Sequence, residues 1–199
     1  MGDHSFESIE ATLKRTVAAL RDAGIPFMLG GSLASWARGG PETRKDLDFI
    51  VKPEDAERAL EVLAEAGMRP ERPPEEWLFK AWDGELLVDL IFEPRGIRVE
   101  DETIERADEL HVLGITIPVI AVEDLMTTKL MSIGEHSVDY SSVLLIARAL
   151  REQIDWAALR RRTASSPYAR AFFVLAEGLE LVPERHAAPG AEVRVLGSP

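Results

Sequence analysis

Hydrophobic residues in the first part of the chain recur at spacings that alternate between those of helices and those of strands. Residues 5–23 have apolar positions every three or four residues, which predicts an amphipathic helix that ends at Gly24. Short apolar runs at residues 25–29 and 46–51 predict two buried strands, and residues 33–37 between them have a helical pattern. The chain therefore begins as a mixture of helices and strands.

This mixture continues to residue 92. A helix is predicted over residues 53–66, because a proline and acidic residues at its start are followed by a clear apolar stripe. Residues 69–76 are rich in proline and charge, and we expect a surface loop there. Residues 77–82 and 86–92 predict two strands that Asp83-Gly84 joins as a hairpin.

The second part of the chain is mainly helical in pattern. Residues 95–109 are mostly polar and have no clean period, whereas residues 115–120 predict a strand that lies at a sheet edge or bends at Pro118. Four helices are predicted after residue 121, at 122–133, 141–151, 156–163 and 167–179.

These patterns predict an α+β fold in two parts with a tail. An α/β core spans residues 1–121, and a helical C-terminal region spans residues 122–182. Residues 183–199 are rich in Ala, Pro and Gly, and we expect this tail to be loosely ordered.

Composition places the chain among globular proteins. Its 199 residues are 46% hydrophobic and 29% charged, which is enough for a sizeable core. The sequence has no apolar run that could span a membrane, no basic start followed by an apolar segment, and no cysteine. We therefore expect a cytoplasmic protein with no membrane partner.

The charge of the chain limits its partners. The formal net charge of -12 argues against a protein that grips a long stretch of nucleic acid through a basic face. An acidic balance is compatible with a small nucleotide–metal substrate or with a cationic partner, and it does not distinguish them. The main basic run, at residues 160–162, is interpreted as a solvated helix face, with guidance of an RNA end as the alternative.

Two glycines and a serine lie between the strand at 25–29 and the next helix. Gly30 and Gly31 permit a sharp turn, and Ser32 stands where a helix N-cap is expected. The backbone N–H groups of such a turn and the Ser32 hydroxyl suit the β- and γ-phosphates of a nucleotide. An ordinary strand–helix turn is the structural alternative.

Two carboxylates follow at the start of the next strand. Asp46 and Asp48 are two residues apart and project from one face of it. Mg²⁺ prefers oxygen ligands, and phosphoryl transfer depends on metal ions that neutralise charge and align the reacting oxygens. Alternatively, the two carboxylates pair with Arg44 and Lys45. Arg44 itself either balances them or contacts a triphosphate.

A third carboxylate, Asp89, lies in the apolar strand at 86–92. Apolar residues flank it on both sides, and a buried carboxylate is unfavourable unless it is paired or bound to a metal. From a neighbouring strand it would complete a cluster of three carboxylates that holds two metal ions. Mutual repulsion within such a cluster is relieved by a bound cation.

This arrangement resembles the nucleotidyltransferase superfamily that includes DNA polymerase beta, the aminoglycoside nucleotidyltransferases and the abortive-infection toxins. The resemblance rests on the Gly-Ser turn at Gly31, on the pair Asp46 and Asp48 and on Asp89, and it covers about residues 25–92. It implies a mixed sheet flanked by helices and two Mg²⁺ ions. By the same resemblance the Asp pair would bind both ions, and the third Asp would bind the catalytic ion and help to activate the acceptor hydroxyl.

A later stretch is similar to the toxin-type (AbiEii/MenT) branch of that superfamily. Lys129 and then Asp139 follow the core, as a lysine and an aspartate do in that branch. The resemblance implies an RNA end as acceptor, such as the 3′ end of a transfer RNA, and a partner protein in a toxin–antitoxin pair. Lys129 lies on an apolar helix, and is either a nucleotide-phosphate contact or a surface lysine.

Two functions of different class follow. The preferred one is a Mg²⁺-dependent nucleotidyltransferase that moves an NMP from an NTP to a hydroxyl of an RNA end or of a small molecule and releases pyrophosphate. The alternative is a catalytically silent nucleotidyltransferase-like module that senses a nucleotide or binds a protein. The four tryptophans are expected to pack in the core, with base stacking by Trp77 or Trp82 as the alternative.

Overall fold

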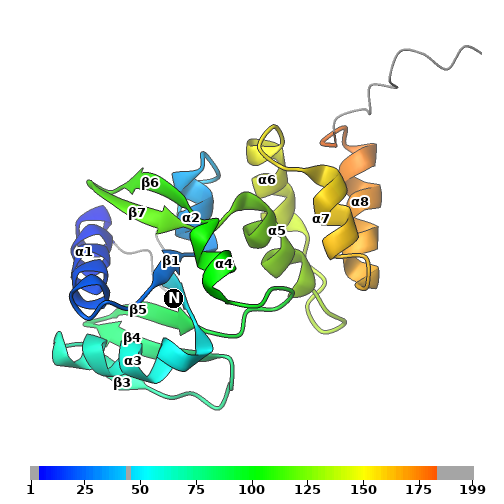
Figure 1. Cartoon of the computed structure of the whole chain (residues 1–199). Helices are drawn as coiled ribbons and strands as arrows, with labels where there is room; N and C mark the ends of the chain where they lie inside the picture. Colours follow the sequence, from blue (N-terminus) through cyan, green and yellow to red (C-terminus); the bar gives the residue numbers. More distant parts are fainter. Residues whose placement is uncertain (1–4, 44–45, 183–199) are drawn as a thin grey trace, which may run out of the picture.

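One seven-stranded sheet organises the part of the chain that the structure describes, residues 5–43 and 46–182 of a computed structural model. Its strands are β1 (Phe27–Leu29), β2 (Leu47–Val51), β3 (Arg69–Glu71), β4 (Leu78–Asp83), β5 (Leu86–Ile91), β6 (Asp108–Val112) and β7 (Ile115–Val119). Their order across the sheet is β3-β4-β5-β2-β1-β7-β6 (Figure 1).

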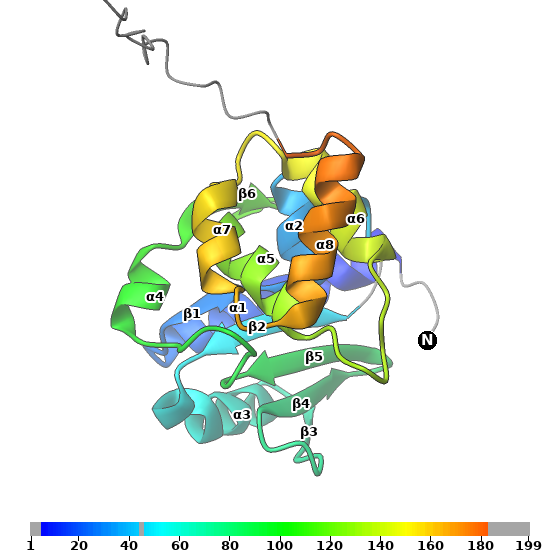
Figure 2. The same cartoon turned by 90° about the vertical axis from the view of Figure 1, so that its right-hand side faces the viewer.

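The helices flank this sheet and extend beyond it. They are α1 (Phe6–Asp22), α2 (Gly31–Ala37), the 3-10 turn η1 (Pro53–Asp55), α3 (Ala56–Glu65), α4 (Asp101–Glu105), α5 (Val122–Met131), α6 (Ser141–Leu150), α7 (Trp156–Arg162) and α8 (Pro167–Gly178). Helices α1 and α3 pack together beside the sheet, and α5 to α8 gather on its other side (Figures 1 and 2).

The sheet is mixed. Strands β1 and β2 are antiparallel, whereas β2 runs parallel to β5 and β1 runs parallel to β7. Parallel neighbours need a crossover, and the connection between β2 and β5 contains η1, α3, β3 and β4. The predicted α+β class, a mixed sheet flanked by helices with a helical C-terminal part, is confirmed.

Buried apolar side chains form two clusters. The first joins the sheet and helices α1 to α3, and it includes Phe27 and Phe49, whose ring centroids are 5.6 Å apart. The second joins α5, α6, α7 and α8 around Phe172 and Phe173. Helix α5 contributes to both, because Leu125 packs in the first cluster and its neighbours in the second. The division into domains at residue 121 stays a prediction.

Most predicted elements are present. The amphipathic helix at 5–23 is α1, which Ser5 caps by accepting a hydrogen bond from the Ser8 N–H at 3.1 Å. The hairpin at Asp83-Gly84 is confirmed, and so are the four helices after residue 121. The predicted tail at 183–199 lies outside the described residues.

The surface loop predicted at 69–76 is wrong in its first part. Arg69–Glu71 forms the edge strand β3, antiparallel to β4. Its residues are polar and mostly exposed, so no alternation of buried positions reveals it. Contacts with Trp82 of the neighbouring strand β4 stabilise this strand instead. The Trp82 Nε1–H donates to Glu71 Oε2 at 2.8 Å, and the Arg69 guanidinium lies over the Trp82 ring.

Strand β7 confirms the strand predicted at residues 115–120, but not the edge position that was one of the two alternatives for it. It is not at the edge, because β6 pairs with it along its length and Pro118 lies opposite Glu109. Residues 95–109, for which no period was found, contain α4 and the start of β6. Strand β6 is short and mostly exposed, which explains its weak apolar pattern.

The described helices include none that is both long enough and apolar enough to cross a lipid bilayer.

Candidate active site

A glycine turn brings the start of α2 against strand β2. Gly31 has a φ of +59°, in the left-handed region that favours glycine, and a Cβ there would lie 1.7 Å from Asp48 Oδ2. The Gly30 N–H donates to the Asp48 carbonyl oxygen at 2.8 Å. The close approach of Asp48 to the turn therefore requires glycine at position 31.

Ser32 is not the N-cap that the sequence predicted. Gly30 is the N-cap of α2, and Ser32 lies within the first turn of the helix. With Gly30 as the N-cap the helix starts at Gly31, two residues earlier than a cap at Ser32 would start it. The Ser32 hydroxyl accepts a hydrogen bond from Thr43 Oγ1 at 3.0 Å, and its backbone N–H donates to the Asp48 carboxylate.

Asp48 is the most perturbed acid of this region. Burial raises its pKa to about 7, and repulsion from Asp89 and Asp46 adds to the rise. The Lys129 ammonium and the Ser32 N–H act in the opposite direction but do not offset it. The site therefore has an excess of negative charge that attracts either a proton or another cation.

Asp89 lies beside Asp48 on the neighbouring strand. The two residues are register partners in the parallel pair β2–β5, so their side chains share a face of the sheet. Lys80 is opposite Asp89 on β4, and its ammonium donates to Asp89 Oδ1 at 3.1 Å. Burial raises the pKa of Asp89, and the negative charge of Asp46 raises it further. The hydrogen bond and the positive charge of Lys80 lower it.

Asp46 completes the set from the residue before β2. It is half-buried, and its charge contributes to the raised pKa of both other carboxylates. Within the described ranges, no three acidic or histidine side chains are grouped closely enough to hold a metal ion in this structure. The chemistry of the donor set suits Mg²⁺, because this ion prefers oxygen ligands and mutual repulsion among the three carboxylates contributes to the raised pKa of Asp48 and of Asp89.

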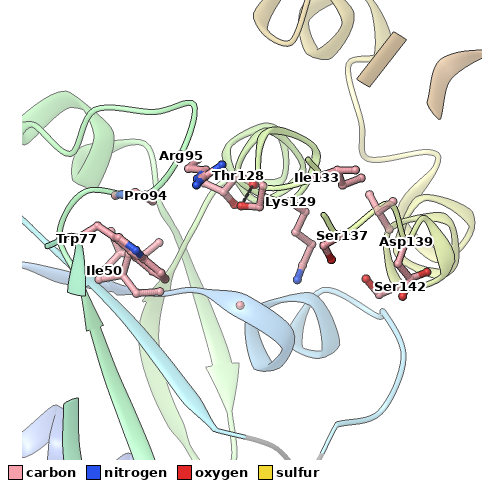
Figure 3. Close-up of a pocket in the computed structure, with 14 residues that line it drawn as sticks. Ile50, Trp77, Pro94, Arg95, Thr128, Lys129, Ile133, Ser137, Asp139 and Ser142 are labelled. Carbon is pink, nitrogen blue, oxygen red and sulfur yellow. Dashed lines mark hydrogen bonds between the residues drawn. The ribbon is translucent and has the colours of Figure 1, made fainter. Parts of the chain in front are cut away.

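Lys129 lies on α5, in the helical part of the chain, and points toward the turn at Gly30–Ser32 (Figure 3). It extends from α5 toward the N-terminal end of α2, on one side of a cavity of about 560 Å³ (Figure 3). Gly31 and Lys129 both line this cavity. The cavity thus begins at the turn that contacts Asp48.

The other walls of the cavity come from both parts of the chain. Trp77 and Arg95 lie on the side of the sheet, and Asp139 and Ser142 lie on the side of α6 (Figure 3). Trp77 does not pack in the core as expected, since 42% of its surface is exposed. Arg44 lies outside the described residues, so its predicted contact with a triphosphate stays a prediction.

Lys80 is a site residue that the sequence prediction missed. Its signal was present, because a two-residue turn at Gly84 places residues 80 and 89 opposite each other. A lysine opposite a carboxylate in an otherwise apolar strand is then a predicted ion pair.

The fold is shared with solved structures at low sequence identity. The solution structure of the antibiotic-resistance factor ANT(2'')-Ia is 17% identical, covers 88% of this chain and 98% of its own, and has a TM-score of 0.62. JHP933 from Helicobacter pylori is 16% identical over 79% of this chain and 73% of its own, with a TM-score of 0.52. TM1012 from Thermotoga maritima is 15% identical, covers 64% of this chain and 86% of its own, and has a TM-score of 0.52. These likenesses concern the fold alone.

The glycine turn, the strand carboxylates and the mixed sheet together define a nucleotidyltransferase-type protein. A family model described as "Uncharacterised nucleotidyltransferase" matches residues 7–181, and the chain belongs to this family. No curated protein matches the sequence. The predicted superfamily is confirmed, whereas the nearness to its toxin-type branch stays a prediction.

Proposed function

We propose that this protein is a Mg²⁺-dependent nucleotidyltransferase that transfers an NMP from an NTP to an acceptor hydroxyl. The observation that carries the proposal is the position of Asp48, next to the turn at Gly31 and beside Asp89, with Lys129 facing the same region. The family to which the chain belongs supports the same reaction class.

Asp46, Asp48 and Asp89 are the residues that would hold the metal. Their oxygens are the donors that Mg²⁺ prefers, and a cation relieves the repulsion that raises the pKa of Asp48. When bound, Mg²⁺ neutralises phosphate charge and helps to align the attacking and leaving oxygens.

The other residues bind and orient the nucleotide. In the turn at Gly30–Ser32, the Ser32 backbone N–H already donates to the Asp48 carboxylate, an arrangement suited to phosphate oxygens. The ammonium of Lys129 points toward the N-terminal end of α2 and adds positive charge near this turn (Figure 3).

Asp89 is the residue proposed to activate the acceptor. Lys80 holds Oδ1, and the second oxygen accepts the proton of the acceptor hydroxyl. The acceptor oxygen then forms a bond to the α-phosphorus, and the bond from that phosphorus to the β-phosphate bridging oxygen breaks. Pyrophosphate leaves with the electron pair of that bond.

The acceptor is proposed to be an RNA end or a small hydroxyl-bearing molecule. The likeness of two cavity residues, Lys129 and Asp139, to the toxin-type branch favours an RNA 3′ end such as that of transfer RNA. The fold shared with an antibiotic-resistance factor favours a small molecule. A cytoplasmic location and a partner protein of a toxin–antitoxin pair stay predictions.

The test is a label-transfer assay. The protein is incubated with each of the four labelled NTPs and Mg²⁺, first with total cellular RNA and then with small hydroxyl-bearing compounds, and pyrophosphate release is followed. Asp48→Asn and Asp89→Asn are expected to lose transfer by at least about a hundredfold. Asp101→Asn is the matched control, because this exposed carboxylate on α4 pairs with Lys52 and not with the site.

The alternative function is decided in the same experiment. A silent nucleotide-sensing module would bind NTP but release no pyrophosphate with any acceptor, and the aspartate variants would not differ from the wild type. Equal pyrophosphate release by the wild type and by both variants would contradict the proposed site.

A further inference from the structure

Trp77 differs from the other tryptophans of the chain. The Trp36 ring contacts Phe6, Trp82 donates to Glu71, and Trp156 packs against Phe173. The indole of Trp77 makes no ring contact and no hydrogen bond with any residue that the structure describes, and it is 42% exposed at the cavity wall. An exposed indole on a cavity wall is a surface that a ligand can cover.

Hydrogen bonds attach the Trp77 backbone to the end of a neighbouring strand. The Trp77 carbonyl oxygen accepts hydrogen bonds from the N–H groups of Phe92 and Glu93, at 3.1 and 3.2 Å. These bonds attach the residue before β4 to the end of β5. The indole is therefore presented from a fixed position of the sheet and not from a free loop.

The segment next to Trp77 is fixed in a similar way. Gly96 has a φ of +84°, and a Cβ there would lie 2.6 Å from Met131 Cγ, so the backbone lies directly against α5. Pro94 and Arg95, just before it, line the cavity near Trp77 (Figure 3). Arg95 forms no ion pair or hydrogen bond with the described part of the chain.

The chemistry of this wall suits a flat heteroaromatic ring. Trp77 offers an aromatic face, and Ile50, Ile91 and Pro94 add apolar surface beside it. An unpaired guanidinium at the same wall suits the polar edge of such a ring. By contrast, Gly31 and Lys129, elsewhere on the cavity wall, suit phosphates. A volume of about 560 Å³ lies within the usual range of ligand pockets.

We infer that Trp77 is the stacking surface for the nucleobase of the NTP, with Arg95 at the edge of that base. This inference rests on the proposed function, because it assigns the second end of the same nucleotide. Stacking uses the face that every base has, so the four NTPs are expected to bind with similar affinity.

The test compares a nucleotide with its phosphate portion alone. Binding of a non-hydrolysable NTP analogue and of tripolyphosphate is measured by calorimetry in Mg²⁺, for the wild type, Trp77→Ala and Trp77→Phe. Trp77→Ala is expected to weaken binding of the analogue about tenfold or more and to leave tripolyphosphate binding unchanged. Trp77→Phe keeps an aromatic face and should stay within about threefold of the wild type.

Leu145→Ala is the matched control, because Leu145 is 55% exposed on α6 and does not line the cavity. If Trp77→Ala leaves both ligands unaffected, or weakens both equally, the stacking assignment is overturned. If it changes only the KM of the acceptor, Trp77 binds the acceptor and the assignment to the NTP is wrong. If the wild type binds neither ligand, the proposed function fails first and the inference with it.

Discussion

At the scale of single residues, Asp48 is a proposed metal ligand whose negative charge lowers the stability of the metal-free protein. Its burial and the nearby charges of Asp89 and Asp46 raise its pKa to about 7, well above the ordinary value near 3.8. The folded metal-free protein therefore binds more protons than the unfolded chain between these two pH values. Its stability is highest at the acidic end of that window and falls as the pH rises through 7.

This gives a first prediction. In EDTA at pH 8, Asp48→Asn should unfold in urea with a free energy about 1–2 kcal/mol larger than the wild type, because the variant has no buried charge at this position. The difference should shrink toward pH 5, where the wild-type carboxyl is protonated in the folded state. A difference that is equal at pH 5 and pH 8 would show that the charge of Asp48 is not its cause.

Gly31 gives a second prediction at this scale. Gly31→Ala places a methyl group on the Asp48 carboxylate and also imposes the left-handed φ on an alanine. We expect a loss of about 3 kcal/mol in unfolding free energy and about a hundredfold in label transfer. Gly24→Ala is the control, because Gly24 has a φ of +67° with nothing within 4 Å, and it should lose only about 1 kcal/mol. Equal losses in the two variants would rule out the contact with Asp48.

The sequence could supply some of the site and not the rest. The candidate carboxylates were predictable because two-residue spacing on a strand and a charge amid apolar residues are local signals. The position of Trp77 on the cavity wall was not predictable, since it depends on how the segment after β5 holds the Trp77 backbone and lies against α5. The assignment of the site residues to metal and nucleotide stays a prediction.

At the scale of elements, the sequence predicted best where one face is buried. Helices α1 and α3 have clear periods because their apolar faces pack in the cluster against the sheet. Strands β3 and β6 were missed because both lie at sheet edges and have few buried side chains. Their strand conformation depends on partners elsewhere in the chain, which no local pattern records.

A buried ion cluster joins three helical segments and gives a third prediction. Asp124 on α5 is fully buried, and Arg106 after α4 donates to it at 2.7 Å. Arg162 at the end of α7 also donates to it. Asp124→Ala leaves two half-exposed guanidinium groups without their partner, and we expect unfolding in urea to become about 2–3 kcal/mol easier.

The control for this prediction is an exposed pair of the same chemistry. Arg151 and Glu152 are in contact at 2.8 Å with both side chains at least half exposed. Glu152→Ala should therefore change the unfolding free energy by less than about 0.5 kcal/mol. A loss of similar size in both variants would mean that burial of Asp124 adds nothing to the pair.

At the scale of the whole molecule, α5 ties the two apolar clusters together. Leu125 packs in the cluster of the sheet, while Met126 and Leu130 pack in that of the C-terminal helices. Unfolding one cluster removes a wall of the other. We therefore expect the chain to unfold in one cooperative transition despite the predicted division at residue 121.

Two single-tryptophan variants test this fourth prediction. One keeps Trp82 in β4 as the probe of the sheet, and the other keeps Trp156 in α7 as the probe of the helical part. Their fluorescence transitions in urea should have the same midpoint. An earlier transition at Trp156 would show that the helices unfold independently, and the two parts would then be separate domains.

The cavity has one further consequence, which concerns how such proteins diversify. Asp46, Asp48 and Asp89 lie in or next to strands of the sheet, while the cavity residues Lys129, Asp139 and Ser142 come from the chain after residue 121. Exchanging the C-terminal helices between relatives would therefore change one wall of the cavity and leave Asp46, Asp48 and Asp89 in place.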